Sequence, residues 1–155
     1  MNSSAADGLP GISTDGLALY FSSRCEGGSG GMGLWVARRN TRNESFSRAE
    51  TLGFGVNSAS DDWGPGISSD GLQLYVMSNR PGGHGREDLW VTTRASTSAT
   101  FGSPRNLGPL VNSATLDGRP NLSADGTTLF FMSDRPGGSG QIDLWQASTR
   151  AHRRR

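Results

Sequence analysis

Residues 65–75 read Pro-Gly-Ile-Ser-Ser-Asp-Gly-Leu-Gln-Leu-Tyr, and the same pattern returns 55 residues before and 55 residues after this stretch. The other copies occupy residues 10–20 and 120–130, and every copy continues through a Gly-Gly loop to a Leu-Trp pair. The tryptophans of these pairs are Trp35, Trp90 and Trp145. A fixed period of this length indicates one supersecondary unit repeated along the chain. Residues that recur at every 55th position are therefore expected to hold the scaffold together, and residues that break the pattern are the better functional candidates.

The composition of the 155-residue chain favours an all-β fold. Twenty-three glycines and a hydrophobic content of 33% fit many short strands joined by tight turns, and no stretch shows the apolar period of a long helix. All fifteen basic residues are arginines, and fourteen acidic residues nearly balance them, so the net charge indicates no nucleic acid partner. No apolar run approaches the length that crosses a membrane, which predicts no membrane insertion.

The sequence predicts no cofactor, no metal site and no catalytic constellation. Two histidines, His84 and His152, and the lone Cys25 do not have the spacing of metal ligands. No Gly-x-Ser-x-Gly motif is present, and the Gly-Gly-x-Gly run lies in a loop between strands, so neither a hydrolase nucleophile nor a phosphate loop is indicated.

Each repeat unit is expected to contain four short strands. The first strand ends at a Ser-x-Asp-Gly turn, which is a hairpin signal because Gly tolerates positive φ and Asp hydrogen-bonds its own backbone. The second strands, at residues 17–21, 72–76 and 127–131, carry large apolar groups on both faces and therefore need cover on both sides. The third strands contain the Leu-Trp pairs, and weaker fourth strands are expected at residues 50–53 and 105–108. Four-stranded antiparallel blades stacked face to face describe a β-propeller, and a solenoid of hairpins is the alternative.

The second unit carries a family resemblance. Residues 62–71 and residues 78–90, the latter with Asn-Arg-Pro-Gly-Gly-x-Gly and Asp-Leu-Trp, resemble the WD40-like β-propeller repeat of TolB-type proteins. The resemblance covers nearly the whole chain and implies a propeller fold with a periplasmic or extracellular location. The family includes scaffolds, ligand-binding proteins and the propeller parts of peptidases. Its usual Ser-Pro-Asp-Gly turn lacks the proline here, and the first residues of the chain lack the charged and apolar regions of an export signal.

The chain is expected to form one partial propeller domain over residues 1–155. Blade 1 covers residues 2–56, blade 2 covers residues 57–111, and blade 3 covers residues 112–150 without an outer strand, followed by a basic tail at 151–155. Propellers close a ring with about four to eight blades. Two explanations stay open: the chain is a fragment of a longer propeller, or two chains form a homodimer that completes a six-bladed ring.

Two sets of recurring residues are assigned to the scaffold. The three tryptophans of the Leu-Trp pairs stand at one repeat position, so core packing is favoured over a platform for sugar stacking. Arg80 and Asp88 stand at the two ends of one Gly-Gly loop, as do Arg135 and Asp143 in the next copy. We expect each guanidinium to pair with the carboxylate across its loop, since both residues are lost together in the first copy.

Candidate ligand-binding residues lie in the loops that a propeller gathers around the mouth of its channel. Asp62 and Asp117 each precede a repeated proline by three residues and would place carboxylates near the axis, although capping of the local turn is the simpler role. Trp63 has no counterpart in the other units, and Arg119 also stands at a variable position. Together with three residues of the second Gly-Gly loop they form the predicted binding surface: His84, Arg86 and Glu87.

The resemblance to TolB-type propellers implies a non-enzymatic propeller that binds a protein, glycan or envelope-associated ligand through its loop face. The alternative is an enzyme or a part of one: a glycan-active propeller, or the propeller of a serine peptidase without its catalytic domain. A glycosidase requires a pair of carboxylates across the channel, and Asp62 and Asp117 are the residues that would supply it.

Overall fold

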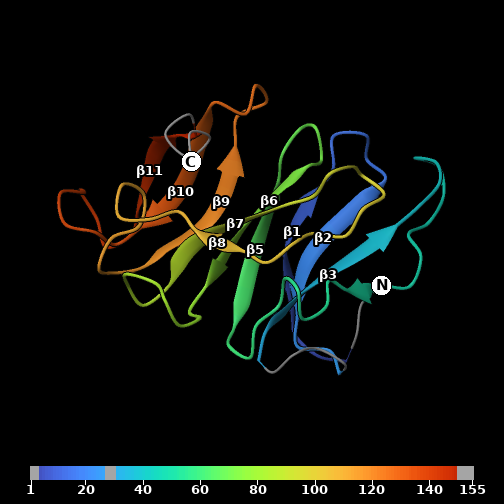
Figure 1. Ribbon diagram of the computed structural model, residues 1–155, viewed down its shortest axis with the longest axis horizontal. Coiled ribbons are helices and arrows are strands. Elements are labelled where there is room, and N and C mark those ends of the chain that lie inside the picture. Colours follow the sequence, from blue (N-terminus) through green and yellow to red (C-terminus); the bar gives the residue numbers. More distant parts are fainter. Residues whose placement is uncertain (1–3, 27–30, 150–155) are drawn as a thin grey trace.

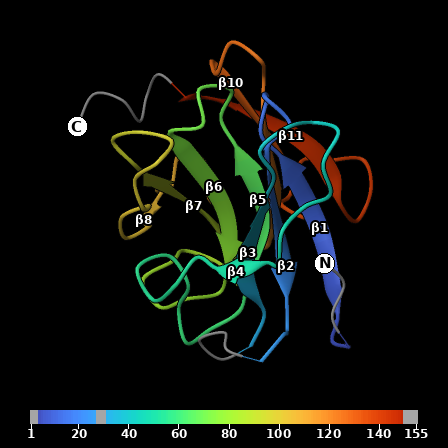
Figure 2. The same cartoon turned by 90° about the vertical axis from the view of Figure 1, so that its right-hand side faces the viewer.

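A computed structural model describes residues 4–26 and 31–149, and every element in these residues is a β-strand. Three antiparallel sheets lie side by side in Figure 1, and Figure 2 views them from the side of the first sheet. Blade 1 consists of β1 (Asp7–Ile12), β2 (Ala18–Ser23), β3 (Gly33–Arg38) and β4 (Glu50–Thr51). Blade 2 consists of β5 (Asp62–Ile67), β6 (Gln73–Ser78), β7 (Asp88–Thr93) and β8 (Arg105–Asn106). Blade 3 consists of β9 (Asp117–Leu122), β10 (Thr128–Ser133) and β11 (Asp143–Ser148).

The all-β prediction is confirmed, and in the described ranges no helix is long and apolar enough to cross a membrane. Within each blade the strands follow one another in sequence order across the sheet. The predicted basic tail at residues 151–155, with His152, lies outside the described residues.

The Ser-x-Asp-Gly segments form the predicted turns between the first and second strands of each blade. In blade 1 the Asp15 carboxylate accepts hydrogen bonds from the Ser13 hydroxyl at 2.5 Å and from the Leu17 amide at 2.9 Å. Gly16 follows at a φ of 73°, in the left-handed region where a residue without Cβ fits best. The same hydrogen bonds recur at Asp70 and Asp125. The sequence therefore specifies these turns by short-range hydrogen bonding.

Apolar cores lie between neighbouring blades. Between blades 1 and 2, Tyr20, Leu34, Val36 and Val56 pack against Leu74, Val76, Trp90 and Phe101. Between blades 2 and 3, Tyr75, Leu89, Val91, Leu107 and Val111 pack against Leu129 and Phe131. β2 and β6 contribute apolar side chains to clusters on both of their faces, whereas among the described residues β10 packs one face into a core and leaves Phe130 on the other face 44% exposed. Trp35 and Trp90 are 8% and 7% exposed and Trp145 packs against the second core, as predicted for scaffold residues.

The first strands of adjacent blades approach one another very closely. A Cβ atom at Gly11 would collide with the carbonyl oxygen of Pro65, and one at Gly66 would collide with that of Pro120. Glycine is required at these two positions because the neighbouring backbone occupies the space of a side chain. The corresponding residue in blade 3 is Asn121, on which no described blade packs.

The predicted fourth strands form, but each is only two residues long. Beyond each short fourth strand, an asparagine at the start of the next unit also bonds the third strand. Asn57 accepts a hydrogen bond from the Leu34 amide at 2.8 Å and donates one to the Leu34 carbonyl at 3.1 Å. Asn112 makes the same pair of hydrogen bonds with Leu89. These side chains tie each blade to the beginning of the next one.

Candidate functional site

The two aspartates nominated at the channel mouth are structural. Asp62 and Asp117 are 0% exposed, and each carboxylate lies 2.5 Å from a guanidinium nitrogen, of Arg80 and Arg135 respectively. The second oxygen of Asp62 accepts hydrogen bonds from the amide and the hydroxyl of Ser58. Both aspartates therefore cap their local turns, which was the simpler of the two predicted roles, and neither presents a carboxylate to a ligand.

The predicted pairing of Arg80 with Asp88 and of Arg135 with Asp143 is wrong. Arg80 turns instead to Asp62, 18 residues earlier in the chain, and its guanidinium lies 5.3 Å from the centre of the Trp90 ring. Asp88 accepts hydrogen bonds from the backbone amides of His84 at 2.5 Å and Gly85 at 3.2 Å. The carboxylate thus closes the Gly-Gly loop on itself, because backbone amides are nearer to it than the guanidinium.

The second Gly-Gly loop is fastened to blade 3. The Arg86 amide donates to the Thr115 carbonyl at 3.0 Å, and the Arg86 guanidinium lies 2.6 Å from the Asp134 carboxylate. Glu87 is half-buried, and its Oε2 atom has no hydrogen-bond partner among the described residues. His84 is exposed at the tip of the loop. Of the three predicted loop residues, Arg86 joins the blades through these contacts, and Glu87 does so through its backbone carbonyl, which accepts a hydrogen bond from the Asp117 amide at 2.9 Å.

Trp63 and Arg119 lie at bulges of the inner strands. The bulge residues Gly64 and Arg119 have φ values of 55° and 51°, so Arg119 holds a left-handed conformation that is uncommon for a residue with a side chain. A Cβ atom at Gly64 would lie 3.5 Å from Cα of Arg119, which places the Trp63 segment beside Arg119. Trp63 is half-buried and Arg119 is exposed. The structure thus brings these two predicted residues together at the junction of blades 2 and 3.

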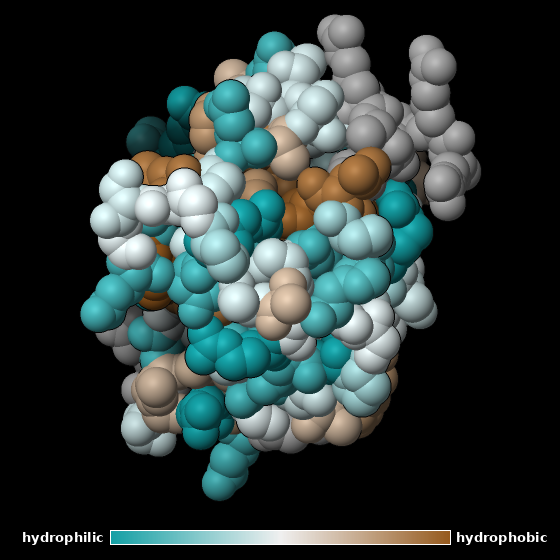
Figure 3. Space-filling view, turned by 90° about the vertical axis from the view of Figure 1, so that its left-hand side faces the viewer, coloured by the Kyte–Doolittle hydropathy of each residue, from teal (hydrophilic) through white to brown (hydrophobic). Residues whose placement is uncertain are grey.

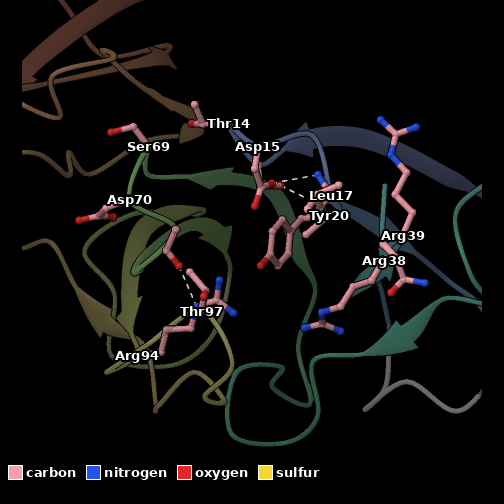
Figure 4. Close-up of a pocket in the computed structure, with 14 residues that line it drawn as sticks. Thr14, Asp15, Leu17, Tyr20, Arg38, Arg39, Ser69, Asp70, Arg94 and Thr97 are labelled. Carbon is pink, nitrogen blue, oxygen red and sulfur yellow. Dashed lines mark hydrogen bonds between the residues drawn. The ribbon is translucent and has the colours of Figure 1, made fainter. Parts of the chain in front are cut away.

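A groove that the sequence did not indicate lies at the opposite ends of the strands, between the hairpin turns of blades 1 and 2. Its volume is about 310 Å³. Figure 4 shows the Tyr20 ring between Arg38 of blade 1 and Arg94 of blade 2. The remaining walls come from the Ser-x-Asp-Gly turns, with Asp15 on one side and Asp70 on the other. The groove is therefore polar and carries both signs of charge.

Tyr20 is 0% exposed, and its hydroxyl has no hydrogen-bond partner among the described residues. The equivalent hydroxyl in blade 2, that of Tyr75, donates to the Gln73 side chain at 3.0 Å. The residue of blade 1 that corresponds to Gln73 is Ala18, which has no polar group to offer. A buried hydroxyl without a hydrogen-bond partner lowers the free energy of unfolding by about 1–3 kcal/mol, so the Tyr20 hydroxyl does not stabilise the fold.

The arginines that line the groove differ in the contacts that their guanidinium groups make. Arg39 donates to the Gly16 carbonyl at 2.8 Å and Arg94 donates to the Gly71 carbonyl at 2.7 Å. Both guanidinium groups also lie 4.5 Å from the centre of a phenylalanine ring, so they brace the turns. Among the described residues, the Arg38 guanidinium has one ion-pair contact, with Glu50 at 3.7 Å, and the side chain is half-exposed. It is replaced by Thr93 and Ser148 in the other units, and so breaks the repeat pattern.

Hydrogen bonds set the charge of the turn that forms one wall. The Ser13 hydroxyl, followed by the Leu17 amide, holds the pKa of Asp15 below its ordinary value of 3.8. Asp15 is therefore ionised at neutral pH and offers a fixed negative charge beside the arginines. In residues 4–26 and 31–149 no cluster of three His, Cys, Asp or Glu side chains that could hold a metal ion occurs.

The signal that could have revealed the groove was present in the sequence. Tyr20 and Tyr75 occupy one repeat position, but only Tyr75 has a glutamine two residues earlier. The rule that pattern-breaking residues are functional candidates also applies to Ala18 and Arg38 at the turn end of the blades.

No family model matches the sequence, and no curated protein matches it significantly. Solved structures resemble its fold. TolB from Acinetobacter baumannii superposes with a TM-score of 0.60 at 19% identity, over 91% of this chain and 29% of that chain. A protein described as TolB from Agrobacterium tumefaciens gives a TM-score of 0.57 at 20% identity, over 91% of this chain and 42% of that chain.

The fold is that of a TolB-type β-propeller. The β-propeller domain of the Trilobed protease from Pyrococcus furiosus also matches, with a TM-score of 0.52 at 14% identity, over 95% of this chain and 40% of that chain. The chain forms about three blades of such a propeller and spans less than half the length of these structures. The expectation of stacked propeller blades is confirmed, and the solenoid alternative is set aside.

Proposed function

We propose that this propeller is a non-enzymatic binding module of the cell envelope that recognises a protein ligand, and that the ligand occupies the groove between blades 1 and 2. The observation that carries the proposal is the buried Tyr20 hydroxyl without a partner. The hydroxyl is buried in the structure, so a ligand would have to displace the side chains over it before one of its polar groups completed this hydrogen bonding, as Gln73 does for Tyr75. The envelope location and the protein ligand rest on the resemblance to TolB-type propellers.

The charges around the groove support a polar peptide segment as the ligand. Arg38 is half-exposed, and in the described part of the chain Glu50 is its one ion-pair partner, so its side chain has room to reposition around a ligand. A carbonyl or carboxylate group of a peptide would accept hydrogen bonds from the Tyr20 hydroxyl and the Arg38 guanidinium. The Asp15 carboxylate on the opposite wall would favour a basic side chain in the same segment.

The enzymatic alternative gains little support from the buried aspartates. A glycoside hydrolase requires two carboxyl groups that reach the substrate from both sides. Asp62 and Asp117 are each fully buried and committed to an arginine and to a turn. A test on fluorogenic glycosides and peptides with the wild type and the Asp62→Asn and Asp117→Asn variants addresses this alternative. Hydrolysis that disappears in both variants, while circular dichroism shows that both are folded, would favour the enzyme.

The proposal is tested by selection of phage-displayed random peptides on the immobilised wild-type protein, followed by calorimetry with the enriched peptides. We expect Tyr20→Phe to weaken binding by about three- to tenfold, because it removes one hydrogen bond, and Arg38→Ala to weaken it by about tenfold. Tyr75→Phe is the matched control and should leave the affinity unchanged.

The loop face that the sequence analysis nominated is the competing location. If Trp63→Ala and Arg119→Ala lower the affinity for the selected peptides while Tyr20→Phe and Arg38→Ala do not, the groove is not the binding site. If no peptide is enriched over an unrelated immobilised protein, the proposal of a peptide-binding module fails.

A further inference from the structure

The arginines at the turns of blades 1 and 2 carry positive charge that the protein's own carboxylates do not contact. Arg39 and Arg94 stand at one repeat position, and each uses its Nε atom to bind the glycine carbonyl of its own turn. In the described part of the chain, no Asp or Glu oxygen lies within 4.0 Å of either guanidinium group. The arginines that brace the loop face each meet an aspartate: Arg80, Arg86 and Arg135. The turn face therefore offers cationic groups that a ligand can neutralise.

Arginine stands on both walls of the groove between blades 1 and 2. Thr149 replaces Arg39 and Arg94 in blade 3 and binds its own turn through its hydroxyl, so among the described blades no second pair of neighbouring turns carries two such arginines. Arg38 adds a third cation, and its contact with Glu50 at 3.7 Å joins side chains that are 50% and 77% exposed. Ion pairs this open to water are weak. A carboxylate of a ligand can therefore displace Glu50 from Arg38.

The groove brings donors of both blades to one ring. Arg38 ends β3, Arg94 follows the end of β7, and Figure 4 shows them on either side of Tyr20. Guanidinium groups donate hydrogen bonds and cannot accept them, so the ligand group between them has to be an acceptor. A carboxylate suits this position best, because its two oxygens can accept hydrogen bonds from both arginines and its charge strengthens each bond.

The aspartates of the groove do not fill this position themselves. Asp15 and Asp70 each accept hydrogen bonds from the serine hydroxyl and a backbone amide of their own turn, which hold both carboxylates against the turns. The groove also offers little apolar anchoring. Exposed hydrophobic residues gather on the side of blade 3, which faces the viewer in Figure 3, whereas hydroxyl-bearing and charged residues make up most of the groove lining. The ligand group that the groove favours is therefore ionic.

We propose that the groove binds the free C-terminal carboxylate of its peptide ligand between Arg38 and Arg94. The proposal rests on the proposed function and narrows the ligand from a peptide segment to the end of a chain. The groove volume of about 310 Å³ lies at the lower limit of the ~300–1,000 Å³ of ligand pockets, which suits a chain end better than a segment that enters and leaves. Terminal carboxylates and acidic motifs are both recurring targets of peptide-binding sites, the latter through arginine clusters.

The probe is a set of random peptides displayed with free carboxyl ends and selected on the immobilised wild-type chain. Each enriched peptide is then synthesised as the free acid and as the C-terminal amide, and calorimetry measures both affinities. We expect the amide to bind at least about tenfold more weakly, because it loses a charge-assisted hydrogen bond. An amidated peptide that ends in glutamate should also bind more weakly than the free acid, which separates the terminal carboxylate from a side-chain carboxylate.

Two protein variants test where the carboxylate binds. Arg38→Gln and Arg94→Gln should each reduce the ratio of acid to amide affinity at least about threefold, since each removes one cationic donor. Arg42→Gln is the matched control and should leave this ratio unchanged, because Arg42 braces the turn of blade 1 through the Asp15 carbonyl at 2.8 Å but does not line the groove. Glu50→Gln should raise the affinity for the free acid about two- to fivefold, since it frees Arg38.

Circular dichroism establishes that each variant is folded, and three results would overturn the proposal. They are equal affinities of acid and amide, binding of the amidated glutamate peptide as tight as that of the free acid, and an acid-to-amide ratio that neither Arg38→Gln nor Arg94→Gln changes. In these cases Tyr20→Phe still decides whether the peptide occupies the groove, so the terminal carboxylate can be ruled out while the proposed function stands. If no peptide is enriched over an unrelated immobilised protein, both proposals fail.

Discussion

At the scale of single residues, buried charge in this protein is held by pairs that lie 18 residues apart. Arg80 and Asp62 are 11% and 0% exposed, so removal of either partner leaves a charge with little access to water. We predict that Arg80→Ala lowers the free energy of unfolding by about 3 kcal/mol. A double-mutant cycle of Arg80→Ala with Asp62→Asn, measured by urea unfolding, should give a coupling energy of about 1–3 kcal/mol. A cycle of Arg80→Ala with Asp88→Asn should give a coupling energy close to zero. A larger coupling energy with Asp88 than with Asp62 would support the pairing expected from the sequence.

The two tyrosines at one repeat position provide a second test at the residue scale. Tyr75→Phe should lower the free energy of unfolding by about 0.5–1.5 kcal/mol, since it removes the hydrogen bond to Gln73. Tyr20→Phe should leave stability unchanged or raise it, because its hydroxyl is buried without a partner. Blade 3 already has phenylalanine, Phe130, at this position. Thermal unfolding of the two variants decides the point, and a larger loss for Tyr20→Phe would mean that its hydroxyl is satisfied.

At the scale of elements, the Ser-x-Asp-Gly turns should make stability depend on acid pH. The Ser123 hydroxyl, followed by the Thr127 amide, lowers the pKa of Asp125 from its ordinary value of 3.8 to about 2. Between pH 4 and pH 2 the unfolded chain therefore binds more protons than the folded one. The contribution of this turn is complete above pH 4 and is lost as the pH falls toward 2. Urea unfolding over this range should show a shallower pH dependence for Asp125→Asn than for the wild type, and an unchanged slope would argue against this role.

The strands and turns could be predicted from the sequence because their determinants are local. Gly16 and Asp15 act within one turn, and the apolar residues of β2 alternate within six positions. The partner of Arg80 could not be predicted in this way. Asp88 is the nearer carboxylate in sequence, 8 residues from Arg80 against 18 for Asp62, and only the pairing of β5 with β6 brings Asp62 to the guanidinium.

The candidate sites were less predictable because burial is set by neighbouring blades. The position of Asp62 in the sequence fits either a carboxylate at the channel mouth or a cap of the local turn, and only the structure shows that its turn and its arginine enclose it completely. The groove at Tyr20 exists only where the turns of two blades meet, although the missing glutamine at Ala18 was a readable clue.

At the scale of the whole molecule, close contact between inner strands fixes how the blades stack. Gly66→Ala should lower the free energy of unfolding by about 1–3 kcal/mol, because the added methyl group meets the Pro120 carbonyl and overpacks the contact. Asn121→Ala changes the equivalent residue of blade 3 and should have little effect. Equal losses in urea unfolding would show that the stacking contact is not the cause.

Hydrogen exchange of the backbone amides, with and without a selected peptide, tests the central claim that the propeller binds its ligand in the groove between blades 1 and 2. The account predicts slowed exchange in the turns that line the groove, at residues 13–18 and 69–72. Exchange at the second Gly-Gly loop and along β11 should be unchanged. Protection confined to the segments of Trp63, His84 and Arg119, with none at the turns, would contradict it.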